Sequence, residues 1–342
     1  MGKFCKVTVN ELSFLARRGD LLLEAALSNN VDLPHDCRSG VCGACRVRLV
    51  NGRVFGDRDD GSGLIHACQS RVISDLEVVT DNMPEASSMS ARVSRLARLA
   101  PDIVGVSLEL AKPLKFLPGQ HCKLQFRGFP ARSFSPTFPL NGGPDDRVLE
   151  FHVRTVPGGR VSSALGNDIG IGHGVKVSGP FGTAFFRPDH PGGIVLVSSG
   201  TGFAPIWSIA VAAIFERPQR ELILVAGTRS VKSLYMLRAL CRLARFPNVS
   251  IVPVVSEPTD LSEAIRAGRP TDYLPRLSRQ DIVYTAGAPA MTARVAEIAR
   301  VAGARCYADP FAISAAADAR ADMGVTVLRK QRAATRLKES PQ

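Results

Sequence analysis

Four cysteines have a spacing that could hold one iron–sulfur centre. Cys37 and Cys42 are separated by four residues, Cys42 and Cys45 by two, and Cys45 and Cys68 by 22. The plant-type C-x4-C-x2-C…C arrangement of a 2Fe-2S cluster has this spacing. The sequence therefore predicts four metal ligands, namely Cys37, Cys42, Cys45 and Cys68.

A zinc site and chance crowding are the alternatives for this loop. Zinc knuckles usually pair two C-x2-C units, and here there is one. The glycines Gly40 and Gly43 favour the cluster, because a loop that wraps it needs a tight path and glycine accepts positive φ angles. A disulfide is not expected in a chain of this size that is predicted to be cytoplasmic. The scattered Cys5, Cys122, Cys241 and Cys306 are expected to be small buried residues.

Three glycine-containing turns could hold phosphate groups. The stretch "PGGRVSS" (157–163) is predicted to open a helix whose first turn carries hydroxyls, which would suit a pyrophosphate. "VLVSSGTGFAPIWSIA" (195–210) is predicted to be strand, Gly-Thr-Gly turn and helix, although it lacks the complete G-x-G-x-x-G pattern. "VYTAGAPAM" (283–291) delivers a second small turn to the carboxyl edge of a predicted sheet, where ligands bind in open α/β folds.

The elements that would position these residues change in character along the chain. Residues 3–9 and 12–16 are predicted to form a hairpin, followed by a short helix with Asp20 as N-cap and Asn29 or Asn30 at its end. Together with the cysteine loop and the strand that follows, this order is compatible with a β-grasp domain. Short alternating segments from 91 to 188 predict an antiparallel barrel. Buried strands that alternate with helices from 192 onward predict a parallel sheet.

The predicted fold is therefore multidomain α+β. It comprises a β-grasp domain with the cysteine loop, an antiparallel β-barrel and an α/β parallel-sheet domain. The expected boundaries are residues 1–82, a linker at 83–90, then 91–189, 190–311, and a basic tail at 312–342.

The charge distribution argues against a nucleic-acid-binding protein. The formal net charge is +12, but residues 1–84 hold ten Lys/Arg and eleven Asp/Glu, so the excess lies in the remainder. No basic stripe with interleaved aromatic residues is present. A positive body beside a near-neutral first domain suits anionic nucleotides and an acidic redox partner.

A membrane location is not expected either. Residues 192–215 carry no charge and are long enough to span a bilayer, but the polar, glycine-rich "SSGTGFAP" in their middle favours a buried strand, turn and helix. No secretion or myristoylation signal is visible at the N-terminus. We expect a cytoplasmic protein, most simply a monomer.

The order of the motifs resembles one known family. A plant-type cysteine loop is followed by R-x-F-S, G-G-R-V-S, G-T-G-F-A-P, A-G-A-P-A-M and a closing "YADPF". This order is similar to the ferredoxin–NAD(P)H reductase superfamily, and most similar to the reductase components of aromatic-ring dioxygenases of the naphthalene dioxygenase reductase type. The resemblance covers residues 3 to about 311. It implies that the three predicted domains are a 2Fe-2S ferredoxin domain, a six-stranded β-barrel FAD domain and an NAD-binding domain.

The resemblance implies roles for particular residues. Ser135 would lie near flavin N5 and Phe311 would cover the flavin face that the nicotinamide must reach, which makes them the candidate catalytic residues. The other implied flavin-binding residues are Arg132, Phe134, His152, Val153, Gly158, Gly159, Arg160, Val161 and Ser162. The implied nicotinamide-nucleotide residues are Gly200, Thr201, Gly202, Pro205, Arg229, Gly287, Pro289 and Met291.

Four features depart from the family pattern. Phe134 stands where a tyrosine is common, and Ala286 stands where a cysteine commonly precedes the turn near the nicotinamide. The third-to-fourth cysteine gap is also shorter than in many relatives, and about thirty residues follow the usual end, which puts the role of Phe311 in doubt.

The predicted function is electron transfer from NADH to FAD, then to the 2Fe-2S cluster, and then to a ring-hydroxylating oxygenase, directly or through a ferredoxin. NADPH use is also expected, because Arg229 and Lys232 follow the second α/β strand and no acidic residue of that segment would accept a ribose 2′-hydroxyl. The alternatives are the same electron chain serving a di-iron monooxygenase or a deoxysugar enzyme, and a non-catalytic iron–sulfur sensor.

Overall fold

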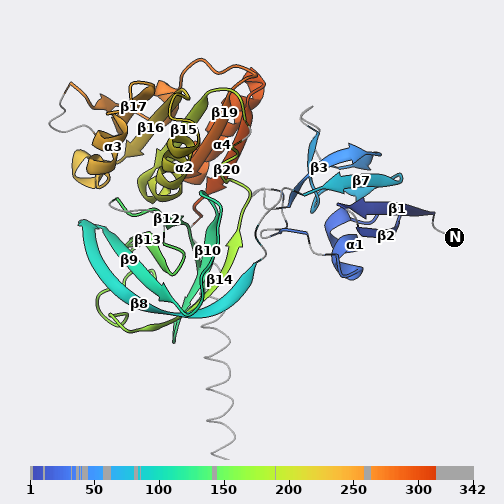
Figure 1. Ribbon diagram of the computed structural model, residues 1–342, viewed down its shortest axis with the longest axis horizontal. Coiled ribbons are helices and arrows are strands. Elements are labelled where there is room, and N and C mark those ends of the chain that lie inside the picture. The colour runs from blue at the N-terminus through green and yellow to red at the C-terminus, as the bar shows by residue number, and fades with distance from the viewer. Residues whose placement is uncertain are drawn as a thin grey trace, which may run out of the picture. The chain divides into compact units, whose positions relative to one another are not determined.

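The computed structural model describes residues 3–10, 12–31, 33–35, 38, 40, 45–56, 63–80, 84, 86–140, 145–188, 190–257 and 263–312. The chain divides into two units, Met1–Pro310 and Phe311–Gln342, and all helices and strands among the described residues belong to the first. Figure 1 shows these elements, which form a five-stranded, a seven-stranded and a six-stranded sheet and a two-stranded ribbon.

The N-terminal sheet has the mixed topology of a β-grasp fold. Its strand order is β2-β1-β7-β3-β5, with β1 antiparallel to β2 and parallel to β7. The predicted hairpin is therefore confirmed. The strands are β1 (Phe4–Val9), β2 (Leu12–Arg17), β3 (Arg46–Asn51), β5 (Leu64–His66) and β7 (Leu76–Val79), with a ribbon of β4 (Val54–Phe55) and β6 (Arg71–Val72).

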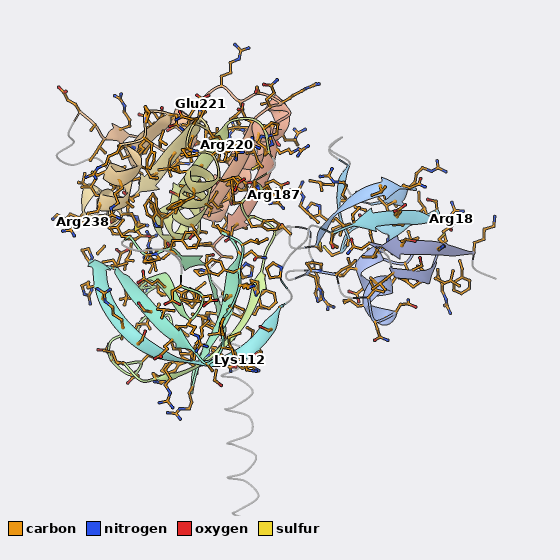
Figure 2. All side chains as sticks on the ribbon, viewed as in Figure 1. Arg18, Lys112, Arg187, Arg220, Glu221 and Arg238 are labelled. Atoms are coloured by element: carbon orange, nitrogen blue, oxygen red, sulfur yellow. The ribbon has the colours of Figure 1, made fainter. Side chains whose placement is uncertain are left out.

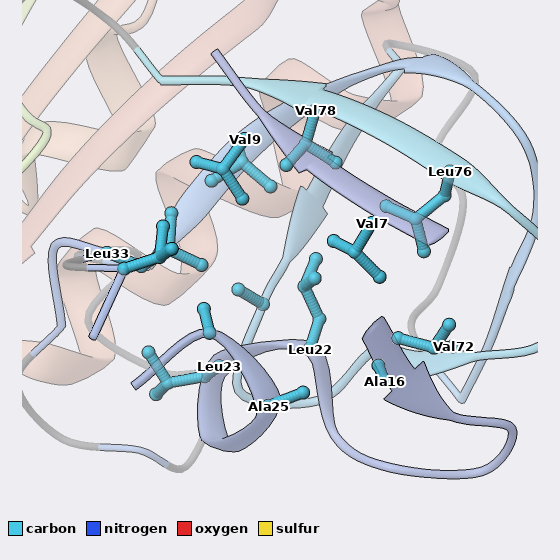
Figure 3. Close-up of a cluster of buried hydrophobic side chains, with 14 of the residues drawn as sticks. Val7, Val9, Ala16, Leu22, Leu23, Ala25, Leu33, Val72, Leu76 and Val78 are labelled. Atoms are coloured by element: carbon cyan, nitrogen blue, oxygen red, sulfur yellow. The ribbon is translucent and has the colours of Figure 1, made fainter. Parts of the chain in front are cut away.

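One helix covers this sheet and completes its core. Helix α1 (Leu22–Ser28) buries Leu22 and Leu23 completely, and Figure 3 shows both side chains among those of Val7, Val78 and Leu33. Strand β1 alternates exposed and buried residues, as a strand with one face on a core must. Cys45 and Cys68 belong to the same buried cluster, so the two thiols rest on this core.

The start of α1 differs from the prediction. The carboxylate of Asp20 accepts a hydrogen bond from the backbone N–H of Arg17, 3.0 Å away, and the N-cap is Leu21. A short acidic side chain can bond to neighbouring backbone in a turn as readily as it caps a helix, and here the turn after β2 takes it. The helix ends with Asn29 as C-cap, as expected.

The second sheet is a near-closed antiparallel barrel. Its order is β11-β10-β14-β8-β9-β13-β12. The strands are β8 (Ser87–Ala100), β9 (Ile103–Leu110), β10 (His121–Phe126), β11 (Arg132–Phe134), β12 (Pro136–Thr137), β13 (Val148–Arg154) and β14 (Gly174–Phe181). Strand β8 begins inside the segment 83–90.

A single residue closes this barrel. β11 and β12 lie at opposite ends of the strand order, yet only Ser135 separates them in the chain. The two short strands are thus halves of one bent strand, whose first half pairs with β10 and whose second half pairs with β13. Counted in this way the barrel has the six strands that the sequence predicts, and Ser135 lies at its seam.

The third sheet is parallel throughout, in the order β18-β17-β16-β15-β19-β20. Strand β15 is buried over Ile194–Ser198, as expected for a strand covered on both faces. The strands are β15 (Ile194–Ser199), β16 (Leu222–Thr228), β17 (Val249–Val255), β18 (Arg266–Ala267), β19 (Ile282–Gly287) and β20 (Arg305–Pro310). The helices are α2 (Phe203–Glu216), α3 (Leu237–Leu243) and α4 (Pro289–Ala302), with 3-10 turns η1 (Gly200–Gly202), η2 (Val231–Ser233) and η3 (Pro270–Tyr273).

An arginine ties the segment after the barrel to the edge of the parallel sheet. The Arg187 guanidinium, labelled in Figure 2, lies 3.6 Å from the centre of the Tyr307 ring and 3.9 Å from that of Phe185. Its backbone N–H donates to the Tyr284 hydroxyl, and the rings of Tyr284 and Tyr307 stack 5.6 Å apart. These contacts anchor β20, which carries a residue of the site described next.

Candidate functional site

Two of the four predicted cluster ligands lie side by side. Cys45 immediately precedes β3 and Cys68 follows β5, and the antiparallel register of these strands pairs Arg46 with His66. The two sulfur atoms are 3.1 Å apart, both residues are buried, and neither forms a disulfide. Two converging buried thiols suit a cluster that needs four thiolates. Cys37 and Cys42 lie outside the described residues, as does Gly43.

The surroundings of Cys68 also fit a negatively charged centre. The Gln69 side-chain amide donates to the Cys68 sulfur over 3.7 Å and to the Arg38 carbonyl over 3.3 Å. Gly40 has a φ of +76°, as predicted for the loop, and a Cβ there would lie 2.8 Å from Gln69 Cγ. Hydrogen bonds to sulfur are one of the features by which proteins set cluster potentials. No motif in the sequence pointed to Gln69.

A buried polar contact lies at the seam of the barrel. The Ser135 hydroxyl donates to Asp309 Oδ2 over 3.2 Å, and Ser135 is only 6% exposed. Asp309 comes from β20 of the parallel sheet, so this bond joins that sheet to the barrel. Asp309 belongs to the "YADPF" motif, in which only the phenylalanine was predicted to have a role. Phe311 is the first residue of the second unit, and its position over the flavin stays a prediction.

The neighbouring strand β13 brings His152 to the seam, where Tyr235 contacts it. Pro136 pairs with Phe151, and Ser135 and His152 are the next residues of the two segments, so both lie at the end of this pairing. The Tyr235 hydroxyl lies 3.2 Å from His152 Nδ1. Burial lowers the pKa of His152 to about 4, which keeps its imidazole neutral at neutral pH. The Val153 side chain points the other way into the barrel core and is 2% exposed.

The predicted flavin-binding residues of β11 flank the same seam. Arg132 and Phe134 alternate with the exposed Ser133, and both are partly buried. Phe134 packs against the barrel core, and Arg132 Nη1 donates to the Ala131 carbonyl over 2.9 Å. Ser135 follows Phe134 directly in the chain, so Arg132, Phe134 and Ser135, three members of the predicted flavin set, lie along one short segment.

The prediction of a helix at "PGGRVSS" is wrong. Residues 157–169 form consecutive turns between β13 and β14. The Ser162 hydroxyl accepts the backbone N–H of Val156, and the Ser163 hydroxyl donates to the Val156 carbonyl. Hydroxyls that bond to nearby backbone compete with helix formation. The turns still carry the remaining predicted pyrophosphate residues, Gly158, Gly159, Arg160 and Val161.

The two turns of the parallel sheet that are predicted to bind phosphate pack backbone to backbone. A Cβ on Gly202 would lie 2.2 Å from the Ala286 carbonyl oxygen, and one on Gly287 would lie 2.4 Å from the Ser199 carbonyl oxygen. The Ser199 hydroxyl accepts the Ala288 N–H over 2.8 Å. Glycine is therefore the residue that fits at both positions. Thr201 lies in the first turn and Pro205 in the first turn of α2; Pro289 and Met291 begin α4.

An arginine from the barrel lies over the first of these turns. A Cβ on Gly200 would lie 2.4 Å from Nη2 of Arg154, which also forms an ion pair with Asp102 at 3.4 Å. The guanidinium thus stands beside the Gly-Thr-Gly turn, where a phosphate would need positive charge. Arg154 was not predicted, because it is one of many arginines in the chain and no motif distinguishes it from the others.

The loop between β16 and α3 (residues 229–236, here called the coenzyme loop because it contains Arg229) lies beside an acidic residue that follows the next strand. Arg229 Nε lies 3.7 Å from Glu257 Oε1, and the Glu257 N–H donates to the Arg229 carbonyl over 2.8 Å. Parallel pairing of β16 with β17 brings the ends of these strands together. The segment 227–235 itself contains no acidic residue, but Glu257, which follows the next strand, lies beside Arg229 and can supply the carboxylate that this segment lacks.

No helix in the described part of the chain is long and apolar enough to cross a membrane. The uncharged stretch 192–215 forms β15, η1 and most of α2, which confirms the predicted strand, turn and helix.

Comparison with known protein families assigns all three parts of the chain. Residues 5–72 match a 2Fe-2S iron-sulfur cluster binding domain, residues 90–186 an oxidoreductase FAD-binding domain and residues 196–297 an oxidoreductase NAD-binding domain. These matches support the fit of the three sites to their cofactors.

Similar proteins share almost the whole length. The reductase component of the naphthalene 1,2-dioxygenase system of Pseudomonas putida is 34% identical over 316 residues, which cover 86% of this chain and 94% of that protein. A reductase component of naphthalene 1,2-dioxygenase/salicylate 5-hydroxylase systems of Ralstonia is 34% identical and covers 81% and 88%. Among solved structures, the Amycolatopsis cytochrome P450 reductase GcoB has a TM-score of 0.65 and 33% identity, with 90% and 98% covered.

Proposed function

The chain belongs to the family of NAD(P)H-dependent reductase components that combine 2Fe-2S, FAD-binding and NAD-binding domains, and on that premise we propose that it supplies electrons from NADH to a ring-hydroxylating oxygenase. The chain is an oxidoreductase, as the motifs predict. The terminal acceptor is reached directly or through a separate ferredoxin.

The observation that supports this proposal most strongly is the meeting of the barrel and the parallel sheet at Ser135. A nicotinamide and a flavin must touch for hydride to pass between them. The seam brings together Ser135, His152 on β13 and Asp309 on β20. Arg154, two residues after His152, lies beside Gly200 of the Gly-Thr-Gly turn and so connects the seam to that turn. A bound FAD supplies the chemistry that accepts hydride and returns electrons singly.

The residues of this chain would bind and position the coenzyme and the cofactors rather than react themselves. Ser135 has a hydroxyl fixed by Asp309, so its oxygen stays in one place when coenzyme enters. Arg154 and the backbone N–H groups around Gly200 and Gly202 would meet the coenzyme phosphates, with the N-terminus of α2 behind them. Cys37, Cys42, Cys45 and Cys68 would hold the cluster.

Coenzyme choice follows from Arg229 and Glu257. Arg229 would attract a 2′-phosphate, whereas the Glu257 carboxylate repels it and can accept a hydrogen bond from a ribose hydroxyl. With both present, NADH is the natural donor and NADPH a weaker one.

The partners follow from the charge distribution and from the names of the relatives. The excess of Lys and Arg beyond residue 84 suits an acidic oxygenase or ferredoxin, and not nucleic acid or membrane. The same electron chain could serve a di-iron monooxygenase, a deoxysugar enzyme or a cytochrome P450. The reductase named for the naphthalene dioxygenase system favours a dioxygenase. We further propose a cytoplasmic monomer.

Anaerobic mixing of the purified protein with NADH tests this function. We expect a yellow-brown protein that releases FAD on denaturation. Its flavin absorbance should bleach in a single turnover when NADH is added. A non-catalytic iron–sulfur sensor would contain iron without a reducible flavin, and that result would overturn the proposal.

A further inference from the structure

One polar contact joins the coenzyme loop (residues 229–236) to β13, which carries His152 and Val153 of the predicted flavin set and is here called the flavin strand. Tyr235 follows η2 in the loop between β16 and α3, and its hydroxyl lies 3.2 Å from Nδ1 of His152 on β13. The two rings meet edge-on, at 88° and with centres 5.2 Å apart. Tyr235 also lines a small cavity with Gly200, Gly227 and Thr228, beside the phosphate-binding turn. Tyr235 was not among the predicted site residues.

The direction of this hydrogen bond follows from its surroundings. Burial raises the pKa of Tyr235, so its oxygen keeps its proton at neutral pH. The positive charge of Arg154 lowers the pKa of the same hydroxyl, against the larger effect of burial. Since a cation attracts the lone pairs of a phenol oxygen and repels its proton, we assign the Tyr235 proton to the bond with His152 Nδ1. A neutral imidazole that accepts at Nδ1 carries its proton on Nε2.

The position of His152 makes this protonation state matter. His152 and Ser135 lie at the same end of the pairing between β13 and β12, next to the pair Phe151 and Pro136, and Asp309 accepts the hydrogen bond of the Ser135 hydroxyl. Tyr235 and Asp309 therefore each fix one polar side chain at the seam, and both come from the parallel sheet's domain. A phenylalanine could pack edge-on as well as Tyr235 does, but only the hydroxyl can select one tautomer.

We propose that Tyr235 is a positioning residue for hydride transfer, which holds His152 in one ring orientation with its proton on Nε2. The same hydrogen bond fixes the position of the coenzyme loop relative to the flavin strand. This inference rests on the proposed function, because it concerns the same transfer. It makes the Tyr235 hydroxyl a determinant of the rate of flavin reduction.

The tautomer provides a readout that does not depend on turnover. Long-range ¹H–¹⁵N spectra of the full-length protein labelled with [¹⁵N]histidine report which ring nitrogen carries the proton, and His152→Gln identifies the signal among the six histidines. We expect Nε2–H in the wild type and a mixture of tautomers in Tyr235→Phe. Nδ1–H in the wild type, or an unchanged His152 signal in Tyr235→Phe, would overturn the proposal.

Single-turnover flavin reduction by NADH tests whether Tyr235 acts through His152. We expect Tyr235→Phe to slow reduction about tenfold, equivalent to about 1.4 kcal/mol, with the NADH dissociation constant changed less than twofold. The double variant with His152→Gln should be no slower than His152→Gln alone. The matched control is Tyr273→Phe, whose hydroxyl donates to the Ala267 carbonyl in the same domain, and it should react at the wild-type rate.

The outcomes separate this inference from the proposed function. If NADH does not reduce the wild-type flavin, the proposed function fails. If it does, but Tyr235→Phe reacts at the wild-type rate, or the two substitutions slow the reaction additively, only the role of Tyr235 fails. Should Tyr235→Phe lose FAD or unfold early, the wild-type spectrum still decides, because the proposal requires the proton on Nε2.

Discussion

At the scale of residues, the seam of the barrel concentrates polar groups that come from distant parts of the chain. Ser135, His152, Tyr235 and Asp309 belong to separate elements, and two hydrogen bonds connect them in pairs. Each of these bonds crosses from the barrel to the parallel sheet. A substitution at one of them should therefore affect electron entry more than it affects folding.

Ser135→Ala tests the first pair. The substitution removes the hydroxyl that donates to Asp309 and leaves the buried strand intact, so FAD should remain bound. We expect single-turnover reduction by NADH to slow by about an order of magnitude, or about 1.4 kcal/mol of transition-state stabilisation. An unchanged reduction rate would remove Ser135 from the site.

Glu257→Gln tests coenzyme choice. The substitution removes the negative charge beside Arg229 but keeps the side chain's shape, so a 2′-phosphate should be better tolerated. We expect kcat/KM for NADPH to rise about tenfold, equivalent to about 1.4 kcal/mol, with little change for NADH. Glu297→Gln, which breaks an exposed ion pair with Arg300 on α4, is the matched control. A wild-type preference for NADH above about 10⁴, or roughly 5.5 kcal/mol, would show that the loop discriminates far more strongly than we infer.

At the scale of elements, the turns decide where the nucleotide can lie. The Gly-Thr-Gly turn and the Ala-Gly-Ala-Pro turn touch through their backbones, so β15, β19 and the helices that follow them are set at a fixed distance. Gly202 has φ and ψ angles of −58° and −14°, which any residue can adopt, so only the missing Cβ explains the need for glycine there.

Gly202→Ala should therefore disrupt the turn by collision alone. Its Cβ would meet the Ala286 carbonyl oxygen at 2.2 Å, and backbone cannot move aside as a flexible side chain can. We expect a loss of about 1–3 kcal/mol in the free energy of unfolding and weaker NADH binding. Gly170→Ala adds a methyl group where nothing lies within 4 Å and should change neither quantity. Equal melting temperatures and NADH affinities for the two variants would contradict this account of the turn.

The elements were predictable where periodicity or spacing determined them. The hairpin, the barrel, the parallel sheet and the strand–turn–helix at 192–215 follow from alternation and buried runs. The helix at 157–163 and the Asp20 cap failed because short polar side chains bonded to nearby backbone instead. Asp309, Tyr235, Arg154 and Glu257 were missed because only strand pairing and packing bring them to the site, and a single sequence does not display those contacts.

At the scale of the whole molecule, three separate cores correspond to three tasks. The N-terminal sheet, the barrel and the parallel sheet each bury their own hydrophobic cluster. Because Cys45 and Cys68 belong to the first cluster only, damage to the iron–sulfur site should leave the other two cores folded. Two-electron entry and one-electron exit should then be separable by mutation.

Cys42→Ser in the full-length protein, assayed with two electron acceptors, tests the central claim that electrons enter at the flavin and leave through the cluster. The variant should lose or strongly destabilise its cluster, because ligand binding and local folding are coupled. NADH should still reduce FAD, and ferricyanide, which takes electrons from reduced flavin, should be consumed at close to the wild-type rate. Reduction of cytochrome c or of the native oxygenase should collapse. If both activities fall together while FAD stays bound, the flavin and cluster do not act as separable stages, and the account is contradicted.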